Sequence, residues 1–436
     1  MRLGPDLTRA DVVALERRHV WPPYTSSEWH ESTDPLVVVG GEGPWIEDAD
    51  GRRLLDGNAS WWAVTLGHQH PRLRAALARQ ADALMHVAAG GITHAPVALL
   101  AKELCAVAPP GLSRVHFSDD GSTAVEVAVK IAFQYWQQNG RPSRTRFLAL
   151  AGAYHGDTLG AASLAAVEEF SRIFAPLLFE VIRPPDPGEG WDPVVEHVER
   201  TLREEGDAIA GVVVEPLIQG AAGMRMHEPS VLRAIADAAR AADTFLIADE
   251  VFTGYGRTGS MWACDHAGVT PDLMCVAKGF TAGVLPMAAT LATERVYDGF
   301  RGGPERALMH GHTFCGNPLG AAVAREVLAI YRDEDIVGQV RAKAPLVARA
   351  FERIGSISGV RSTRARGLVG AADLGDGGYH GRLGWRVFEA ALERGAFLRP
   401  LGDTVYVSPA LNISEHDLGL LLDILEDSIR AVMRGL

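Results

Sequence analysis

Two charged residues stand where apolar runs end, and together they could act on a small molecule. Asp249 follows the run TFLIA, and Lys278 follows LMCVA 29 residues later. A lysine amine can form a Schiff base with a carbonyl group, and a carboxylate can hold a proton on a ring nitrogen. The pair therefore indicates chemistry on a heterocyclic cofactor. The simpler alternative for Lys278 is a strand-end lysine that extends its amine into solvent.

The stretch around Asp249 also fits the motif of an ATPase. Apolar residues followed by Asp249-Glu250 are typical of a Walker B strand. Such an ATPase also needs a phosphate loop of the form G-x-x-x-x-G-K-[ST]. The chain has only four lysines, and none follows a glycine or precedes a serine or threonine: Lys102, Lys130, Lys278 and Lys343. The sequence therefore excludes a phosphate loop of this kind.

Residues 254–259, GYGRTG, match the G-x-G-x-x-G string of dinucleotide-binding turns. In such a turn the strand runs directly into the first glycine, and a helix begins near the third. Here residues 249–253 separate the apolar run from the first glycine, and the following SMWACDHAG is a weak start for a helix. The context therefore disfavours a nicotinamide or flavin site.

The elements that must position these residues alternate between helix and strand. Apolar runs without period-two alternation are predicted strands at 113–118, 146–152, 208–216, 244–250 and 272–278. Predicted helices lie between or beside them at 71–85, 122–140, 193–206 and 229–243. This pattern predicts an α/β fold with a mostly parallel sheet covered by helices on both faces. We expect an N-terminal segment at 1–65 that contributes to the smaller domain and to the entrance of the active site, a large domain at 66–320 and a smaller α+β domain at 321–436.

Two further features fall at predicted strand ends. Gly121 and Ser122 open a long helix after the strand SRVHFS, and a helix N-terminus attracts phosphate. Taken alone, Ser122 is more simply a helix cap. Tyr154 places an aromatic ring after the strand RFLAL. An amine, a carboxylate, a phosphate-binding helix start and a ring at four strand ends match the needs of pyridoxal phosphate.

Composition favours an ordinary enzyme over other classes of protein. The net charge of −12 is spread without long runs, which argues against nucleic-acid and membrane partners. The four cysteines form no C-x-x-C pair, and the histidines lack the spacing of a metal site. No signal peptide or membrane-spanning run is visible, so we expect a cytoplasmic protein without a metal.

At this point the chain resembles the class III, fold-type I aminotransferases over nearly its whole length. The family as a whole is indicated by ADEVFTGYGRTG, by AKG around Lys278 and by HGHTFCGNPLG. VWPPY, DGNASWW, GGITHAP, AYHGDT and LRPLGD resemble one branch, which aminates 8-amino-7-oxononanoate in biotin biosynthesis. The resemblance implies a ping-pong transamination on pyridoxal phosphate. The alternatives are another class III ω-amino acid transaminase, a dehydrogenase or a non-catalytic binding protein.

The resemblance also implies roles for individual residues. Lys278, Asp249 and Tyr24 would be catalytic, with Lys278 as the Schiff-base lysine and proton carrier. The cofactor would be held by Gly121, Ser122, Tyr154, Asp249 and Lys278, and by His312 and Thr313 from the neighbouring subunit of a homodimer. The substrate would be contacted by Tyr24, Trp61, Tyr154, Arg257, Lys278, Gly311 and Arg399. Arg399 would pair with the carboxylate of 8-amino-7-oxononanoate.

The sequence also departs from the family at three places. Asp120 stands where serine is common before the phosphate-binding Gly-Ser, so it must point away from the phosphate or cap the helix. His312 stands where many members have proline. Residues 163–180 and RPLGD resemble a branch that uses lysine as amino donor, whereas GGITHAP resembles the users of S-adenosylmethionine. The donor is predicted to be S-adenosylmethionine, with lysine as the alternative.

Overall fold

A computed structural model describes residues 7–376 and 378–435 and contains a central sheet of seven strands. The strands lie in the order β4 (Leu112–Ser118), β12 (Ala288–Thr293), β11 (Leu273–Val276), β10 (Phe245–Asp249), β7 (Ile209–Val214), β5 (Arg146–Ala149) and β6 (Val181–Ile182). The strands from β11 to β6 run parallel, and β12 is antiparallel to both its neighbours. The predicted mostly parallel sheet is confirmed. Strand β12 was not predicted, because its AATLAT is rich in alanine, which is depleted in strands.

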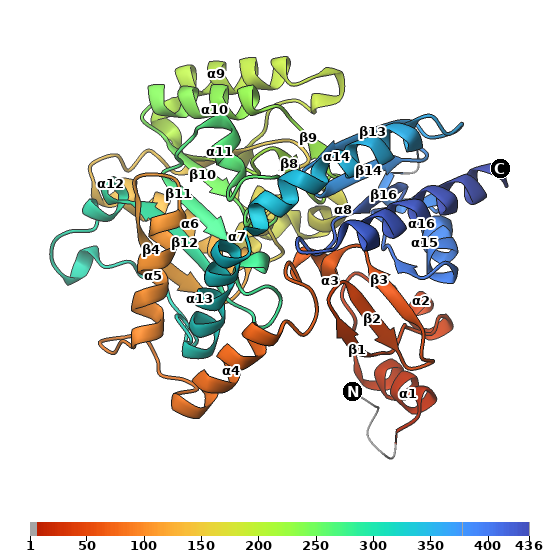
Figure 1. Ribbon diagram of the computed structural model, residues 1–436. Helices are drawn as coiled ribbons and strands as arrows, with labels where there is room; N and C mark the ends of the chain where they lie inside the picture. Colours follow the sequence, from red (N-terminus) through yellow and green to blue (C-terminus); the bar gives the residue numbers. More distant parts are fainter. Residues whose placement is uncertain (1–6, 377, 436) are drawn as a thin grey trace.

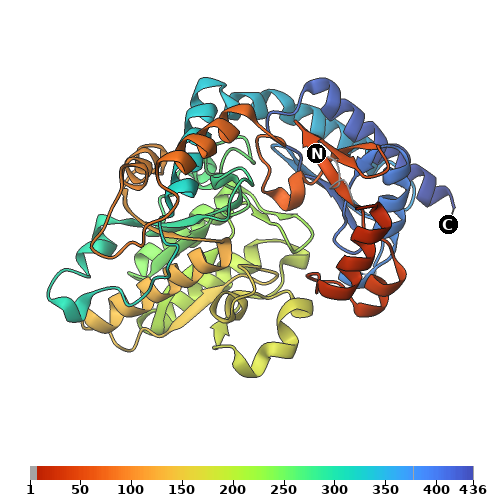
Figure 2. The same ribbon diagram turned by 90° about the horizontal axis from the view of Figure 1, so that it is seen from below.

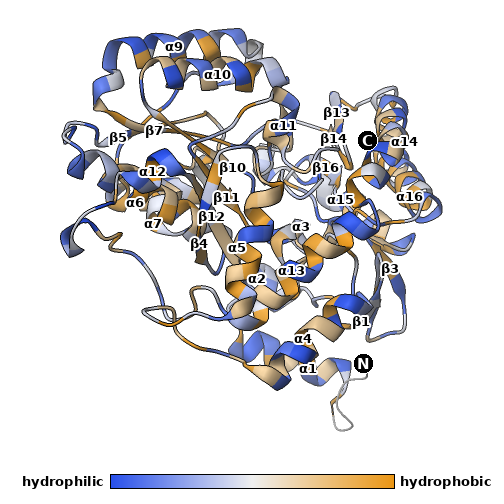
Figure 3. Cartoon of the chain, turned by 60° about the vertical axis from the view of Figure 1, so that its left-hand side comes forward, coloured by the Kyte–Doolittle hydropathy of each residue, from blue (hydrophilic) through white to orange (hydrophobic). Residues whose placement is uncertain are grey.

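Helices cover both faces of this sheet, as its apolar strands require. In β5, the side chains of Phe147 and Ala149 belong to the hydrophobic cluster that includes α6 (Gly121–Gln138). The Leu148 side chain belongs to the cluster on the other face, which includes α9 (Asp192–Glu205) and α10 (Pro229–Ala241). Because both faces are buried at the centre of the sheet, β7, β10 and β11 are apolar except for Asp249 at the end of β10. Figure 3 shows this contrast between the hydrophobic sheet and the hydrophilic outer surface of α9.

The two ends of the chain come together in smaller sheets. Strands β1 (Val38–Glu42), β2 (Trp45–Asp48) and β3 (Arg53–Asp56) form an antiparallel meander, and β15 (Ala396–Phe397) pairs in parallel with β3. Figures 1 and 2 show the N-terminal segment beside the C-terminal part. This pairing supports grouping 1–65 with 321–436, but the domain boundaries stay a prediction, and residues 1–6 lie outside the described residues.

The remaining elements are these. Strands β13 (Ser362–Arg366), β14 (Val369–Asp373) and β16 (Thr404–Val407) form a second antiparallel sheet, and β8 (Ile218–Gln219) pairs with β9 (Arg225–Met226). The other helices are α1 (Arg9–His19), α2 (Ser27–Ser32), α3 (Ala59–Trp62), α4 (Pro71–Ala83), α5 (Ala95–Val107), α7 (Leu159–Leu164), α8 (Glu168–Ser171), α11 (Ala263–Ala267), α12 (Glu294–Asp298), α13 (Pro318–Asp333), α14 (Ile336–Gly355), α15 (Leu383–Glu393) and α16 (Glu415–Arg434). No helix within 7–376 and 378–435 is long and apolar enough to cross a membrane.

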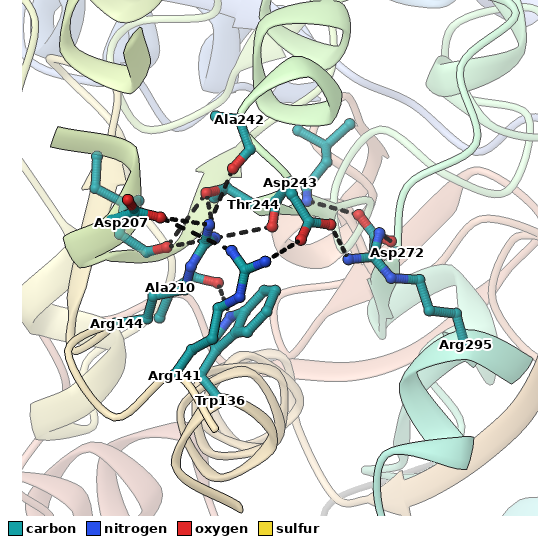
Figure 4. A network of polar contacts seen from close by, with 12 residues as sticks. Trp136, Arg141, Arg144, Asp207, Ala210, Ala242, Asp243, Thr244, Asp272 and Arg295 are labelled. Carbon is teal, nitrogen blue, oxygen red and sulfur yellow. Dashed lines mark hydrogen bonds and ion pairs between the residues drawn. The ribbon is translucent and has the colours of Figure 1, made fainter. Parts of the chain in front are cut away.

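A buried arginine fixes the amino ends of the central strands (Figure 4). Arg144 donates to the backbone carbonyls of Asp243 at 2.8 Å and Ala242 at 3.0 Å, just before β10. It also donates to the carbonyl of Ile209, the first residue of β7, at 3.3 Å. Its guanidinium carbon lies 4.3 Å from the centre of the Trp136 ring. This cluster lies at the edge of the sheet opposite Asp249, so it stabilises the strands and leaves their carboxyl ends open.

Candidate active site

The carboxyl ends of the central strands surround a cavity of about 420 Å³. Its walls include Asp249 at the end of β10, Lys278 after β11 and Tyr154 after β5, together with Gly121 and Ser122 at the start of α6. The structure therefore brings together the five residues for which the sequence predicted a shared cofactor site. Parallel strands end at one edge of the sheet, so separate strand ends converge there.

Asp249 is held by two hydrogen bonds in a nearly dry position. Nδ1 of His155 donates to Oδ2 of Asp249 at 2.7 Å, and the backbone N–H of Val251 donates to Oδ1 at 3.0 Å. Both side chains are buried. Because a carboxylate only accepts, the proton of this contact belongs to His155 Nδ1. His155 therefore orients Asp249 toward the cavity, a role that was not predicted from the sequence.

The Lys278 amine faces the same cavity, and its surroundings shift its pKa. Burial lowers the pKa of Lys278, while the carboxylates of Asp249 and Glu215 raise it. Its Nζ lies 5.1 Å from the centre of the Trp62 ring. The backbone at Lys278 has φ of 47°, a left-handed conformation that a residue with a side chain adopts at a cost. Such strain at a strand end is typical of a reacting residue.

Glu215, at the end of β7, is a third carboxyl group in the cavity wall. Its oxygens accept from the backbone N–H groups of Tyr154 and Gly220, each at 3.0 Å. Burial raises the pKa of Glu215 to about 7, with His155 opposing and Asp249 adding to the rise. Like His155, Glu215 was missed, although it follows an apolar strand as Asp249 does.

The start of α6 offers a cradle that only small residues permit. A Cβ on Gly121 would lie 2.8 Å from Val251 Cγ1, and one on Gly156 would lie 2.1 Å from Ser122 Oγ. Gly156 also has φ of 120°, which favours glycine. The free N–H groups of the first turn and the Ser122 hydroxyl thus remain open to an anion.

Asp120, which stands where serine is common in the family, caps the helix that it precedes. It is the N-cap of α6: its side chain accepts from Thr123 N at 2.9 Å, and the Thr123 hydroxyl accepts from Asp120 N at 3.0 Å. The carboxylate is therefore engaged with the helix backbone, the second of the two arrangements that the sequence allowed.

Two tryptophans sit on a left-handed turn beside the cavity. Residues 59–62 all have positive φ, between 45° and 74°, although none is glycine. Each costs about 1–2 kcal/mol in this conformation, so surrounding contacts must hold the turn. Trp62 is buried, packs 4.5 Å from Phe252 between ring centres, and donates from Nε1 to the Tyr406 hydroxyl at 3.1 Å. The turn directs Trp62 into the cavity. Trp61 stays outside the cavity wall, next to Tyr24 and Arg399, and these three residues mark what we call the mouth of the cavity.

Polar and aromatic groups surround that mouth. Tyr24 and Trp61 are 44% and 42% exposed, and their ring centres lie 5.5 Å apart. The hydroxyls of Tyr24 and Tyr154 lie 3.1 Å apart, and both donate to the exposed carboxylate of Asp157, Tyr154 at 2.8 Å. Burial raises the pKa of Tyr24 to about 12, so its hydroxyl stays protonated.

Arg399 is also brought to the mouth. Its guanidinium carbon lies 4.8 Å from the centre of the Trp61 ring and 5.7 Å from that of Trp385. This double stacking holds a cation where a substrate carboxylate could reach it.

Other predicted residues lie outside the cavity wall. Arg257 is 1% exposed and donates from Nη1 to the Pro409 carbonyl at 2.5 Å, while its Nη2 has no hydrogen-bond partner among the described residues. The glycines of GYGRTG do turn the chain sharply, with φ of 82° at Gly256 and 96° at Gly259. They bury Arg257 behind the cavity, and its role as a substrate contact stays a prediction.

The segment predicted to serve a second subunit does not line the cavity of its own chain, although His312 approaches its wall. Gly311 and Thr313 are exposed. His312 is half-buried, with Nε2 3.6 Å from Oδ1 of Asp119, which lines the cavity. Within residues 7–376 and 378–435, no group of three or more His, Cys, Asp or Glu side chains could hold a metal ion.

Pyridoxal phosphate fits the residues present. The glycine cradle at α6 suits a phosphate, Asp249 suits a protonated ring nitrogen, and Lys278 suits the reactive carbonyl carbon. The site is therefore that of a pyridoxal phosphate-dependent transferase.

Comparison with known proteins agrees with this class. The family model described as aminotransferase class-III matches residues 25–429, and the chain belongs to this family. Adenosylmethionine-8-amino-7-oxononanoate aminotransferase of Geobacter sulfurreducens is 40% identical over 99% of this chain and 100% of that protein. The crystal structure of the enzyme of the same name from Methanocaldococcus jannaschii has a TM-score of 0.93 at 32% identity, covering 96% of this chain and 98% of that one.

An amine transaminase from an uncultivated Pseudomonas species has a TM-score of 0.89 at 33% identity, covering 95% of this chain and 99% of that one. Its structure is of the form with pyridoxal phosphate bound. The protein is thus a fold-type I, class III aminotransferase that uses pyridoxal phosphate, as the sequence predicted.

Proposed function

We propose that the protein transfers an amino group from S-adenosylmethionine to 8-amino-7-oxononanoate, giving 7,8-diaminononanoate for biotin biosynthesis. The observation that carries the proposal is the full-length similarity to relatives named for this reaction, joined to a cavity holding Lys278 and Asp249. Arg399 at the mouth supports it further, because 8-amino-7-oxononanoate carries a carboxylate at the end remote from its reacting carbon.

The chain's own residues would divide the work as follows. Pyridoxal phosphate, when bound, supplies an electron sink for charge on the carbon beside the transferred nitrogen. Gly121 and Ser122 hold its phosphate, and Asp249 keeps its ring nitrogen protonated. Lys278, whose pKa burial lowers, accepts a proton from the donor carbon and returns one. Trp62 excludes water from the reacting end of the cavity.

We further propose a cytoplasmic homodimer with shared sites. The exposure of Gly311 and Thr313, beside a cavity that they do not line, supports their use by a second copy. In that arrangement the partner subunit's His312 and the partner subunit's Thr313 contact the phosphate, and the partner subunit's Gly311 contacts the substrate.

Lysine is the second candidate for the amino donor. The observation that favours it is residues 163–180, which resemble the lysine-using branch.

The test is direct detection of the product. Protein loaded with pyridoxal phosphate is incubated with 8-amino-7-oxononanoate and either S-adenosylmethionine, lysine or no donor, and 7,8-diaminononanoate is measured by mass spectrometry. We expect product with S-adenosylmethionine and none with Lys278→Ala at equal folded concentration. Product with lysine alone moves the protein to the second candidate. Amination of simple ketones without amination of 8-amino-7-oxononanoate contradicts both.

A further inference from the structure

Two polar side chains of α6 hold an irregular segment of the chain by its backbone. Lys130 and Gln134 are four residues apart, so they lie on one face of the helix. Nζ of Lys130 donates to the carbonyl of Met309 at 2.7 Å. The Gln134 amide donates to the carbonyl of Ala307 at 2.7 Å and accepts from the N–H of Met309 at 3.3 Å. Segment 307–313 belongs to no helix or strand, so these contacts fix its path.

The charge of Lys130 is used for this contact rather than for a carboxylate. Its ammonium makes no ion pair within residues 7–376 and 378–435. Nζ also lies 3.3 Å from Nδ1 of His310. Because an ammonium can only donate, Nδ1 accepts, and the His310 ring is neutral with its proton on Nε2. Burial and the Lys130 charge both lower the pKa of His310, which keeps this acceptor available near neutral pH.

The held segment ends at a residue that the proposed homodimer assigns to the second active site. Thr313 lies four residues beyond Met309 and is exposed, and it does not line the cavity of its own chain. No helix or strand intervenes between the two residues. The position of Thr313 therefore depends directly on where Met309 is held.

Lys130 is remote from the phosphate cradle of its own chain. Gly121 and Ser122 open α6, and Lys130 lies about 13 Å further along the helix axis. It does not line the cavity of its own chain. An effect of Lys130 on cofactor binding within one chain would have to pass along the helix, whereas an effect on a second subunit passes through four residues of the segment.

We propose that Lys130 is a positioning residue for the active site of the other subunit, because its hold on Met309 and His310 places Thr313 at the phosphate of the neighbouring cofactor. The inference rests on the proposed homodimer with shared sites. Helix α6 then supports two sites at once. Its first turn binds the phosphate in its own chain, and its Lys130 face supports the phosphate site of the partner.

The experiment measures the affinity for the cofactor. Pyridoxal phosphate is titrated into the apoprotein, and the absorbance of the lysine-bound cofactor gives its dissociation constant. Lys130→Met keeps the length of the side chain but has no donor, and Lys130→Arg keeps the charge and the donors. Gln138→Leu is the matched control, because Gln138 also lies on α6 and donates to the carbonyl of Gly299 at 3.0 Å, outside the held segment. Thermal unfolding is measured on each preparation.

We expect the Lys130→Met homodimer to bind the cofactor about 3- to 30-fold more weakly than wild type, at a nearly unchanged unfolding temperature. Lys130→Arg should recover most of the affinity, and Gln138→Leu should stay near wild type. Unchanged affinity in Lys130→Met, or an equal loss in Gln138→Leu, overturns the proposal.

Mixed dimers identify the subunit on which Lys130 acts. Lys130→Met and Lys278→Ala subunits carry different affinity tags, are co-expressed and are purified through both tags. Only the Lys130→Met subunit can then bind the cofactor covalently, and its partner supplies an intact Lys130. We expect wild-type affinity at this site. An affinity as weak as that of the Lys130→Met homodimer places the effect within one chain and refutes the inference.

A second mixed dimer separates this inference from the proposed homodimer. It contains Thr313→Ala in place of Lys130→Met, and it should likewise regain the affinity that the Thr313→Ala homodimer loses. Recovery with Thr313→Ala but not with Lys130→Met rejects the role of Lys130 alone. Recovery with neither, or failure to isolate any mixed dimer, rejects the shared site and the inference with it.

Discussion

His155→Leu tests how the carboxylate of Asp249 is held. In the wild-type protein His155 Nδ1 donates to Asp249 at 2.7 Å, and the only other hydrogen bond to that carboxylate among the described residues comes from Val251 N at 3.0 Å. Leucine is close to histidine in size but offers no donor. The substitution therefore leaves one oxygen of a buried carboxylate without its partner, while the packing stays nearly constant.

The size of the effect follows from the kind of bond removed. A hydrogen bond to a charged group contributes about 1.5–3 kcal/mol. If that energy holds Asp249 against the cofactor ring during proton transfer, kcat should fall about 10- to 150-fold. The Michaelis constants should stay near wild type, because His155 contacts Asp249 rather than the mouth where substrates bind.

The assay is steady-state amination of 8-amino-7-oxononanoate, with cofactor affinity and thermal unfolding measured on the same preparations. His155→Asn is the matched control, because its side-chain amide can donate from the place of Nδ1. We expect His155→Asn to recover much of kcat. An unchanged kcat in His155→Leu, or an equal loss in both variants, refutes the view that this hydrogen bond positions Asp249.

Three further predictions concern other parts of the site. Asp120→Ala should lower the free energy of unfolding by about 1 kcal/mol in denaturant titrations, whereas Asp120→Ser should keep the cap and nearly all of the stability. The pKa of Glu215 is about 7 in the folded protein, against an ordinary value of 4.5 for the unfolded chain. As the pH rises, the unfolded chain therefore releases the Glu215 proton at a lower pH than the folded protein does. The ligand-free protein should therefore lose up to about 3 kcal/mol of unfolding free energy as pH rises from 4.5 to 7. In Glu215→Gln the unfolding free energy should fall less steeply over this pH range. An equally steep fall in both proteins counts against the raised pKa of Glu215. Arg257→Met should leave the Michaelis constants for both substrates unchanged if its burial keeps it from substrate, and a roughly tenfold rise in the Michaelis constant for either substrate would instead establish the substrate contact that the family resemblance predicts.

The sequence predicted the parts of the site that depend on local pattern. Asp249 and Lys278 end apolar runs, and parallel strands place such ends together without further information. The helix start at Gly121 is equally local. Glu215 carried the same strand-end signal, at VVVEP, and could have been found by applying the rule to every strand. His155 lies six residues beyond the end of β5, so it carried no such signal.

The other features depend on contacts between distant segments. Nothing in DGNASWW indicates a left-handed turn, which is held by Tyr406, 344 residues beyond Trp62. Arg257 is buried because the loop at Pro409 packs over it. Lys130 meets Met309, 179 residues further on, only in the folded chain. Hydrophobic periodicity carries no information about such encounters.

The most direct test of the proposed chemistry is to find which lysine carries the cofactor. The protein is loaded with pyridoxal phosphate, reduced with borohydride, digested and examined by peptide mass spectrometry. With only four lysines in the chain, every candidate can be followed, including Lys343, whose pKa burial lowers to about 8. We predict the reduced phosphopyridoxyl group on Lys278 alone. Modification at Lys343 or another lysine with Lys278 intact, or no modification at all, contradicts the assignment of Lys278 as the residue that carries the cofactor.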